Sequence, residues 1–332
     1  MVEQISGKLA REICNKFPKH GNLTLAKILF KENKTVYTSV ETARAAIRRV
    51  RGSKGEDSNK LVKDKSLFGQ NKITTSGYNL PEEYNEEIKE FKIPRAYKRV
   101  GIISDAHIPF HSNEYIAASL NYLKSKKIDC LLLNGDIADC YQLSRFEKDP
   151  RKRSFANELE SIRQFLDVLA KHFPNTKIYY KIGNHELRYQ KFLLGKAPEL
   201  LGVEEFRFDA LLQFGKRGIG LIEDKQIVQA GKLNILHGHE IIGGAGGVNP
   251  ARSMYLKTSE SVLVSHFHKT SSHTETSILG KMTTTHSIGC LCYLRAEYMP
   301  YNKWNAGFAY VDIESNGDYE LQNLRILKGK VY

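Results

Sequence analysis

The stretch RVGIISDAH, residues 99–107, decides the fold, because a nearly continuous apolar run ends there in a carboxylate and an imidazole. Two later runs, IDCLLLN at 128–134 and KIYYKIG at 177–183, are also apolar along much of their length. Such runs are typical of strands in parallel sheets that are covered on both faces. Helical patterns at 113–126 and 154–172 separate the three runs. Alternating strand and helix predicts an α/β layer fold with a largely parallel sheet.

The C-terminal third of the chain contains more strand-like stretches. They are ILHGHE (235–240), SVLVSHFH (261–268), a threonine-rich stretch (282–288), FAYVDIE (308–314) and YELQNLRIL (319–327). Because they follow the parallel strands in the sequence, we expect them to form a second sheet packed on the first.

Side chains that can bind metals follow five of the expected strands. In chain order they are Asp105 and His107, Asp136, Asn184 and His185, His237 and His239, and His266 and His268. Functional groups in α/β sheets gather at the carboxyl ends of the strands. The sequence therefore predicts one rim that is rich in imidazole and carboxylate groups.

The order D-x-H, G-D, G-N-H-E, H and then H-x-H resembles the calcineurin-like metallophosphoesterase family over about residues 98–315. The resemblance implies a sandwich of two mixed β-sheets flanked by helices. Stretches such as LSRFEKDPRKR and NKWNAGFAY resemble phosphoesterase chains of phages and prophages. The expected activity is therefore metal-dependent hydrolysis of a phosphoester.

In that family two metal ions share the site, and the resemblance assigns each motif a role. It implies that a first ion binds Asp105, His107 and His268, that a second binds Asn184, His237 and His266, and that Asp136 bridges them. A water between the ions would attack phosphorus, with His185 as general acid. Mixed nitrogen and oxygen ligands favour Mn²⁺, with Fe, Zn²⁺ and Mg²⁺ as alternatives.

Some of these positions leave alternatives open. Either His237 or His239 can be the fourth-motif ligand; the family pattern favours His237 and places His239 near the substrate. Ser265 stands where the family has glycine, which we expect to alter only backbone room. Arg188 and Arg145 are candidates for binding phosphate oxygens, although Arg145 also fits an ordinary surface position.

The first quarter of the chain is basic and helical. Residues 1–80 hold 16 Lys and Arg against 7 Asp and Glu, within a net charge of +13 for the whole chain. Apolar spacing predicts a helix over 3–17, a second from about residue 22, and a third from a capping box at Thr38–Glu41 to Gly52. Arg44, Arg48 and Arg51 share one face of the third helix, which resembles a helix-turn-helix DNA-binding unit.

These patterns divide the chain into three parts. Residues 1–52 form a basic trihelical domain resembling a helix-turn-helix, residues 53–95 a linker with a short acidic helix at 81–91, and residues 96–332 the metallophosphoesterase domain. A basic domain of this kind favours DNA or RNA as a partner. A solvated face or a protein-binding module remains the alternative.

Composition limits the class of protein. No apolar run is long enough to span a bilayer, and the N-terminus lacks a signal-peptide core. Five cysteines without a CxxC pair indicate a reducing compartment, with Cys290 and Cys292 open to a structural, metal or redox role. We expect a cytoplasmic protein of a bacterium or a phage-infected host cell, with no membrane contact.

Three functions fit these features. The first is a phosphodiesterase or nuclease that its N-terminal domain brings to nucleic acid. The second is a phosphomonoesterase acting on phosphoprotein or small molecules, with the N-terminal domain as an adaptor. The third is a non-enzymatic DNA-binding regulator, which the intact ligand set and His185 argue against.

Overall fold

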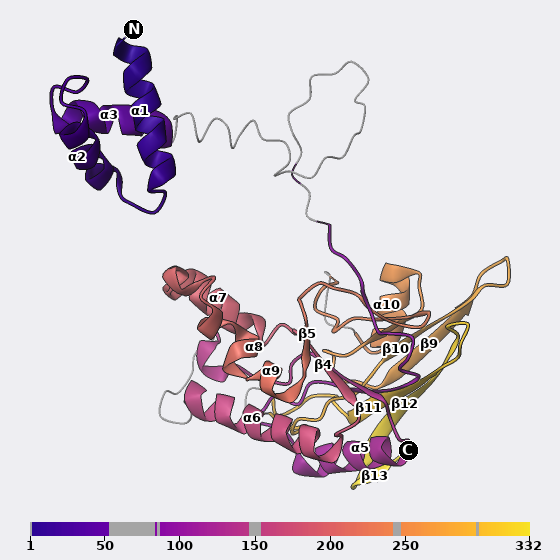
Figure 1. Ribbon diagram of the computed structural model, residues 1–332. Coiled ribbons are helices and arrows are strands. Elements are labelled where there is room, and N and C mark those ends of the chain that lie inside the picture. The colour runs from indigo at the N-terminus through magenta and orange to yellow at the C-terminus, as the bar shows by residue number, and fades with distance from the viewer. Residues whose placement is uncertain (1, 53–83, 85–86, 146–153, 242–246, 297–298) are drawn as a thin grey trace. The chain divides into compact units, whose positions relative to one another are not determined.

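The structure is a computed structural model that describes residues 2–52, 84, 87–145, 154–241, 247–296 and 299–332 (Figure 1). The chain forms two compact units, Met1–Glu86 and Glu87–Tyr332. Most of the predicted linker lies outside the described residues, as do residues 81–83 and 85–86 of the short helix expected at 81–91. The described residues Glu87–Glu90 are not helical, and the second unit begins before residue 96 because β1 (Phe91–Lys92) pairs with β6 (Val228–Ala230).

The larger unit contains a seven-stranded sheet in the order β13-β12-β11-β2-β3-β4-β5. The predicted parallel strands and the helices between them are confirmed. They are β2 (Arg99–Ile103), α5 (Asn113–Ser125), β3 (Cys130–Asn134), α6 (Phe155–His172) and β4 (Lys177–Lys181), followed by β5 (Gly220–Ile222).

The parallel strands are apolar along most of their length because both of their faces are covered. Leu131 and Leu133 of β3 belong to the core beneath α5 and α6, whereas Leu132 belongs to the core between the two sheets. Side chains alternate in the same way along β2, where Ile102 and Ile103 face opposite cores. Figure 1 shows α5 and α6 along one face of these strands.

The second sheet has six strands in the order β1-β6-β7-β8-β10-β9. It contains β7 (Leu233–Ile235), β8 (Val262–Val264), β9 (Ser271–Thr276) and β10 (Met282–Ser287). The prediction that all the C-terminal stretches form this sheet is wrong for the last two of them, which form β11 (Ala306–Ile313) and β12 (Tyr319–Leu327) and are followed by an unpredicted strand, β13 (Lys330–Val331). They join the first sheet because β11 pairs antiparallel with the open edge of β2. The expected sandwich of two mixed sheets flanked by helices is confirmed.

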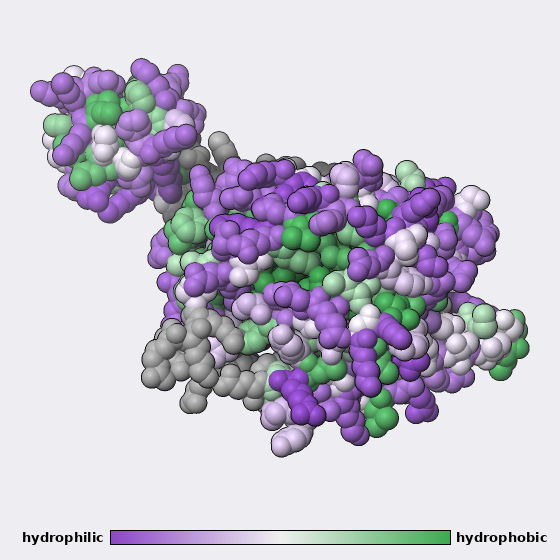
Figure 2. Space-filling view, turned by 90° about the horizontal axis from the view of Figure 1, so that it is seen from below, coloured by the Kyte–Doolittle hydropathy of each residue, from purple (hydrophilic) through white to green (hydrophobic). Residues whose placement is uncertain are grey.

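Several short elements were not predicted. They are α7 (Leu187–Lys196), α8 (Phe208–Leu211), α9 (Phe214–Arg217), α10 (Pro250–Thr258) and three 3₁₀ turns, η2 (Tyr141–Leu143), η3 (Pro198–Leu200) and η4 (Glu204–Phe206). Hydrophilic residues cover most of the face shown in Figure 2, with apolar residues between them. None of the helices in the described part of the chain has the length and apolar composition needed to cross a bilayer. All five cysteines are buried, and none of them forms a disulfide.

The smaller unit consists of the three predicted helices, α1 (Val2–Lys16), α2 (Asn22–Glu32) and α3 (Val40–Arg51). Its core includes Leu25, Leu29 and Ile47, which are almost completely buried. The predicted capping box is displaced by one residue. The Ser39 hydroxyl accepts from the Thr42 N–H at 3.2 Å, and the Thr42 hydroxyl accepts from the Ser39 N–H at 3.0 Å, because α3 begins at Val40.

The predicted arginine face of α3 is divided between surface and interior contacts. Arg48 is exposed, and so is Arg49 beside it. Arg44 is half-buried and pairs with Glu41 at 3.4 Å. Arg51 is partly buried, and its guanidinium lies 2.8–3.2 Å from four backbone carbonyls at the end of α1 and in the turn after it. These contacts satisfy carbonyls that the end of a helix leaves unpaired.

Candidate metal centre

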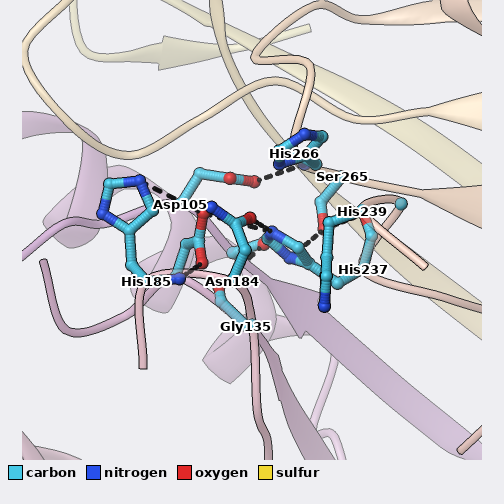
Figure 3. Close-up of polar contacts among 12 residues, drawn as sticks. Asp105, Gly135, Asn184, His185, His237, His239, Ser265 and His266 are labelled. Carbon is cyan, nitrogen blue, oxygen red and sulfur yellow. Dashed lines mark hydrogen bonds and ion pairs between the residues drawn. The ribbon is translucent and has the colours of Figure 1, made fainter. Parts of the chain in front are cut away.

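Side chains from the ends of β2, β3, β4, β7 and β8 meet at one rim, as the sequence predicted. Figure 3 shows several of them turned toward one another. Four groups of described residues place their donor atoms within 4.8 Å of one another, and two of them consist wholly of predicted metal ligands: Asp105 with His107 and His268, and Asp136 with His237 and His266.

The first group brings two imidazoles to one carboxylate. Nε2 of His268 lies 3.2 Å from Oδ1 of Asp105 and 3.2 Å from Nε2 of His107. All three side chains are buried. Nδ1 of His107 and Nδ1 of His268 point the other way, toward Asp139 at 3.1 Å and Cys292 Sγ at 3.9 Å. Each Nε2 is thereby directed into the cluster.

The second group includes an amide as well as imidazoles and a carboxylate. Nε2 of His237 lies 3.2 Å from Oδ2 of Asp136 and 3.2 Å from Oδ1 of Asn184. Nδ1 of His237 lies 2.7 Å from the carbonyl of Asn134, which fixes the ring from behind. The ring of His266 lies 5.2 Å from that of His237, centre to centre. The buried His237 thus takes the inner position in the fourth motif.

Asp136 faces both groups. Its Oδ2 lies 3.2 Å from Nε2 of His237, 3.9 Å from Nε2 of His107 and 3.9 Å from Nε2 of His185. Its Oδ1 accepts a hydrogen bond from the backbone N–H of His185 at 2.9 Å. One carboxylate therefore stands between two donor sets, which is the position that a bridging ligand requires.

The backbone takes an unusual conformation at these residues. Asp105, His107, Asp136, His266 and His268 all have φ between 49° and 66°. Side chains other than glycine seldom adopt this left-handed region, at a cost of about 1–3 kcal/mol each. Five such residues in one cluster show that the fold holds these side chains in place against local preference.

The residues present fit divalent cations. Asp105 Oδ1 is buried and accepts no well-aligned hydrogen bond from the described residues, although Nε2 of His268 lies 3.2 Å away. Burial raises the pKa of Asp105, but the imidazole of His268 lowers it to about 2. Burial lowers the pKa of His268, but the carboxylate of Asp105 raises it to about 10. A cation can replace a proton held in this way, because metal binding displaces protons from its ligands.

Glu186 holds the Asp136 turn in place. Its carboxylate accepts backbone N–H groups from Asp136, Ile137 and Ala138 at 2.9–3.0 Å, and the hydroxyl of Tyr180 at 2.7 Å. Gly183 is required nearby, because a Cβ on it would overlap Asp136. The sequence placed Glu186 in the third motif, but nothing in the spacing showed that it holds the second motif.

A buried ion pair fixes the fourth motif. Lys181 at the end of β4 lies 2.9 Å from Glu240, whose carboxylate accepts the backbone N–H groups of His237 and Gly238. The hydroxyl of Ser265 lies 3.1 Å from Nδ1 of His237. The expectation that Ser265 alters only backbone room is therefore wrong, since its hydroxyl joins the network behind the ligands.

His185 lies at the edge of both groups and has its own partners. Its Nδ1 lies 3.0 Å from the backbone carbonyl of Asp139 and 3.1 Å from the carboxylate of that residue. Arg188 donates to the same carbonyl at 2.9 Å, and its other terminal nitrogen lies 3.0 Å from Nε2 of His185. Sequence reasoning missed Asp139, although an acidic residue three positions after Asp136 was visible.

Two predicted substrate contacts lie farther out. His239 pairs with Asp224 at 2.9 Å, and its ring lies 5.3 Å from that of His237, centre to centre. Arg145 is exposed at the end of a described stretch, before residues 146–153, which lie outside the description. Cys290 and Cys292 lie behind His268 and are buried, on the side away from Asp105.

Known proteins that are similar to part of this chain include a phage protein and two solved structures. The Gene 54 protein of Mycobacterium phage L5 is 26% identical over 236 residues, which cover 65% of this chain and 89% of that protein. Among solved structures, Vacuolar Protein Sorting 29 from Cryptosporidium parvum aligns with a TM-score of 0.38 and 15% identity, covering 71% of this chain and 95% of that one. The phosphoesterase Yfce from E. coli aligns with a TM-score of 0.32 and 14% identity, covering 68% and 98%.

The family comparison identifies the larger unit. Residues 98–277 match the family model of the calcineurin-like phosphoesterases, and all the residues of the two donor groups lie within that range. This chain therefore belongs to the calcineurin-like phosphoesterase family and is a metal-dependent phosphoester hydrolase.

Proposed function

We propose that this chain is a two-metal phosphodiesterase that acts on nucleic acid. The observation that carries the metal assignment is the position of Asp136, whose Oδ2 faces imidazoles of both donor groups. One ion would bind Asp105, His107 and His268, the other Asn184, His237 and His266, with Asp136 between them. The nitrogen and oxygen donors favour Mn²⁺, with Fe, Zn²⁺ and Mg²⁺ as alternatives.

Two divalent cations in these positions would supply a nucleophilic water near neutral pH and draw charge from the phosphoryl oxygens. The chain's own contribution begins with ligand orientation. Asp139, Asn134 and Cys292 each face the outer ring nitrogen of a ligand histidine, so the inner nitrogens are directed at the ions. The buried network around Glu186 and Glu240 keeps these groups from relaxing.

His185 is the proposed general acid. Asp139 anchors its Nδ1, which leaves Nε2 on the side of Asp136 and Arg188. Arg188 donates to this Nε2 at 3.0 Å, so the guanidinium must turn to the phosphate before Nε2 can carry a proton and pass it to the leaving oxygen as its bond to phosphorus breaks. Arg188 lies next to that nitrogen and would bind a phosphate oxygen. His239, oriented by Asp224, and Arg145 are the proposed outer contacts to the substrate.

The N-terminal unit supplies the reason to propose nucleic acid. Arg48 and Arg49 are exposed on α3, with Arg44 on the same side of the helix. An exposed cationic helix can bind successive phosphates of a polyanion. We place this activity in the cytoplasm of a bacterium or a phage-infected cell, which the similarity to a mycobacteriophage chain supports.

The test is a substrate panel with the full chain and Mn²⁺. It compares a chromogenic monoester, a chromogenic diester, single- and double-stranded DNA, RNA and a phosphopeptide. We expect turnover of the diester and of at least one nucleic acid, and weaker turnover there for the Arg48→Ala/Arg49→Ala variant. Turnover of the monoester and phosphopeptide alone would reject the proposal in favour of a phosphomonoesterase with an adaptor domain. No turnover with metal bound would favour a non-enzymatic regulator.

A further inference from the structure

The only tryptophan of the chain lies against the metal centre. The ring of Trp304 is 4.2 Å from the ring of His268, centre to centre, with the two planes at 63°. His268 is one of the donors of the first group. Trp304 is half-buried, so solvent reaches part of the side chain. A large aromatic surface is thus presented beside the place where a phosphate would bind.

The segment that carries Trp304 is held by hydrogen bonds on both sides. The backbone N–H of Trp304 donates to the side-chain oxygen of Asn302 at 2.9 Å. The side-chain amide of Asn302 donates to the carbonyls of Leu294 and Met299. The next residue, Asn305, donates its N–H to the carbonyl of His268 at 2.9 Å. The backbone that carries the indole is therefore held in place before any ligand arrives, which lowers the entropy cost of binding.

Packing alone does not explain an aromatic residue at this position. Phe308 and Tyr180, which do fill the core of this unit, are fully buried, whereas Trp304 is not. The orientation of His268 is also set without Trp304. Its Nε2 faces Asp105 at 3.2 Å and its Nδ1 faces Cys292.

The two chain segments that the Asn302–Leu294 hydrogen bond joins carry exposed cationic and aromatic residues. Arg295 and Lys303 are exposed, and the exposed fractions of Tyr293 and Tyr301 are 63% and 97%. The N–H of Tyr293 donates to the carbonyl of Phe110, so this segment runs beside the loop that follows His107. Proteins that bind single-stranded nucleic acid combine aromatic rings that stack on bases with cations that follow the phosphates. This mixture favours a nucleotide over a phosphopeptide.

We propose that Trp304 forms a stacking subsite for the nucleobase next to the scissile phosphate. The phosphate would lie over Asp105, His107 and His268, and the base would stack on the indole. The inference rests on the proposed nucleic-acid substrate and makes it more specific, because a base must be free of its partner strand to stack there. Single-stranded nucleic acid or the frayed end of a duplex is then the substrate class.

The single tryptophan makes a direct test possible with the unmodified full chain. Paramagnetic Mn²⁺ quenches a nearby indole, so its addition should lower the emission of Trp304 as the centre fills. Three ligands are then added to the Mn²⁺-loaded protein: thymidine 5′-monophosphate, 2-deoxyribose 5-phosphate, which lacks only the base, and phenyl phosphate. Emission and calorimetric affinity are recorded for each, and chromatography afterwards checks that the ligands are intact.

We expect the nucleotide to change the emission and to bind about 5- to 150-fold tighter than the sugar phosphate, the usual contribution of one stacked base. In Trp304→Ala that preference should fall to within about twofold by calorimetry, with unchanged Mn²⁺ content. Trp304→Phe, which keeps a smaller ring and guards against misfolding, should retain an intermediate preference. Tyr332→Ala, which removes an exposed aromatic side chain at the C-terminus, is the matched control and should behave as wild type.

The outcomes separate this inference from the proposed function. Bound Mn²⁺ with equal affinity for nucleotide and sugar phosphate would overturn the subsite and leave the two-metal centre standing. An equal gain with phenyl phosphate would overturn the assignment to a nucleobase, since any aromatic ester would then bind. A wild-type preference in Trp304→Ala would place the base elsewhere. Failure to bind Mn²⁺, Fe²⁺, Zn²⁺ or Mg²⁺ would overturn the centre and the subsite together.

Discussion

The rim of the metal centre and the arginine face of α3 were both predicted from residue patterns. The structure agrees with the first prediction more fully than with the second. At the rim, the residues from five separate stretches meet within one cluster. On α3, Arg48 reaches the surface, whereas Arg51 is engaged by carbonyls of its own unit. The predicted rim residues thus lie together in the structure, whereas the three predicted arginines do not share one kind of environment.

The difference comes from what each pattern constrains. Parallel strands of one sheet end at the same edge, so the polar residues that follow them lie close together at that edge. A helical period fixes only the side of the helix on which a residue lies. It does not say whether neighbouring backbone groups will use that residue, because α1 and its turn are distant from α3 in the sequence.

The largest expected effect tests the rim through Asp136. Asp136→Asn should lower the turnover of a chromogenic diester by at least about 10³-fold, the upper range for loss of one electrostatic contact, because this carboxylate serves both donor groups. The same variant should bind less Mn²⁺ at both positions. Turnover and metal content by mass spectrometry are the measurements.

Asp318→Asn is the matched control for this change. It neutralises an exposed carboxylate that pairs with Lys232 at 2.7 Å, and it should leave both quantities unchanged. Wild-type metal content and turnover in Asp136→Asn would show that the bridging ligand lies elsewhere. The rim would then be no better predicted from the sequence than the arginine face.

The next effect separates chemistry from metal binding at the same rim. His185→Ala should lower turnover by about 10²–10⁴-fold while metal content stays near wild type, because His185 acts as acid rather than ligand. The loss should be smaller for a substrate whose leaving group needs no proton. Loss of metal in this variant would instead make His185 a ligand, as its proximity to His107 and Asp139 allows.

The sequence could predict the parallel strands and the ligands that follow them, because each depends on a short local run. It could not predict that β11 would pair with β2, since Ala309 and Ile102 meet across two hundred residues and nothing local marks the pair. The supports behind the ligands were missed for a similar reason. Glu186 and Glu240 are ordinary acidic residues until the fold brings backbone N–H groups to them.

The third effect tests the surface part of the arginine face. Each phosphate that a protein neutralises contributes about 0.9 to the slope of log affinity against log salt for duplex DNA. Arg48→Ala/Arg49→Ala should therefore reduce that slope by up to about two and weaken binding at low salt. Anisotropy titrations at several salt concentrations measure it.

Lys27→Ala/Lys31→Ala is the matched control, because it removes the same charge from exposed positions on α2. An equal change in slope for both double variants would mean that net charge, and not the α3 face, governs binding.

A smaller effect concerns Glu158, which holds the turn that follows Asp139, the residue that contacts His185. Glu158 accepts the backbone N–H groups of Cys140 and Tyr141, and burial raises the pKa of this carboxyl to about 7. A folded-state pKa above the unfolded value adds stability at low pH that is lost as pH rises through about 7, here at most about 3 kcal/mol. Denaturant unfolding followed by Trp304 emission should show this decline, and Glu158→Gln should remove that part of it. An identical pH dependence in both proteins would contradict the assignment.

The smallest expected effect on DNA binding is that of Arg51. It decides whether this residue stabilises the three-helix unit or contacts nucleic acid at the surface. Its guanidinium contacts four backbone carbonyls, and hydrogen bonds to a charged group contribute about 1.5–3 kcal/mol. Arg51→Ala should therefore destabilise the three-helix unit by about that amount and raise hydrogen exchange in α1 and α3. Arg51→Lys should restore only part of the loss, because an ammonium cannot reproduce the planar fork. Where the unit is still folded, DNA affinity should match wild type. Normal hydrogen exchange together with lost DNA affinity in Arg51→Ala would mean that Arg51 contacts nucleic acid, as the helical spacing predicted. The arginine face would then be as well predicted as the rim.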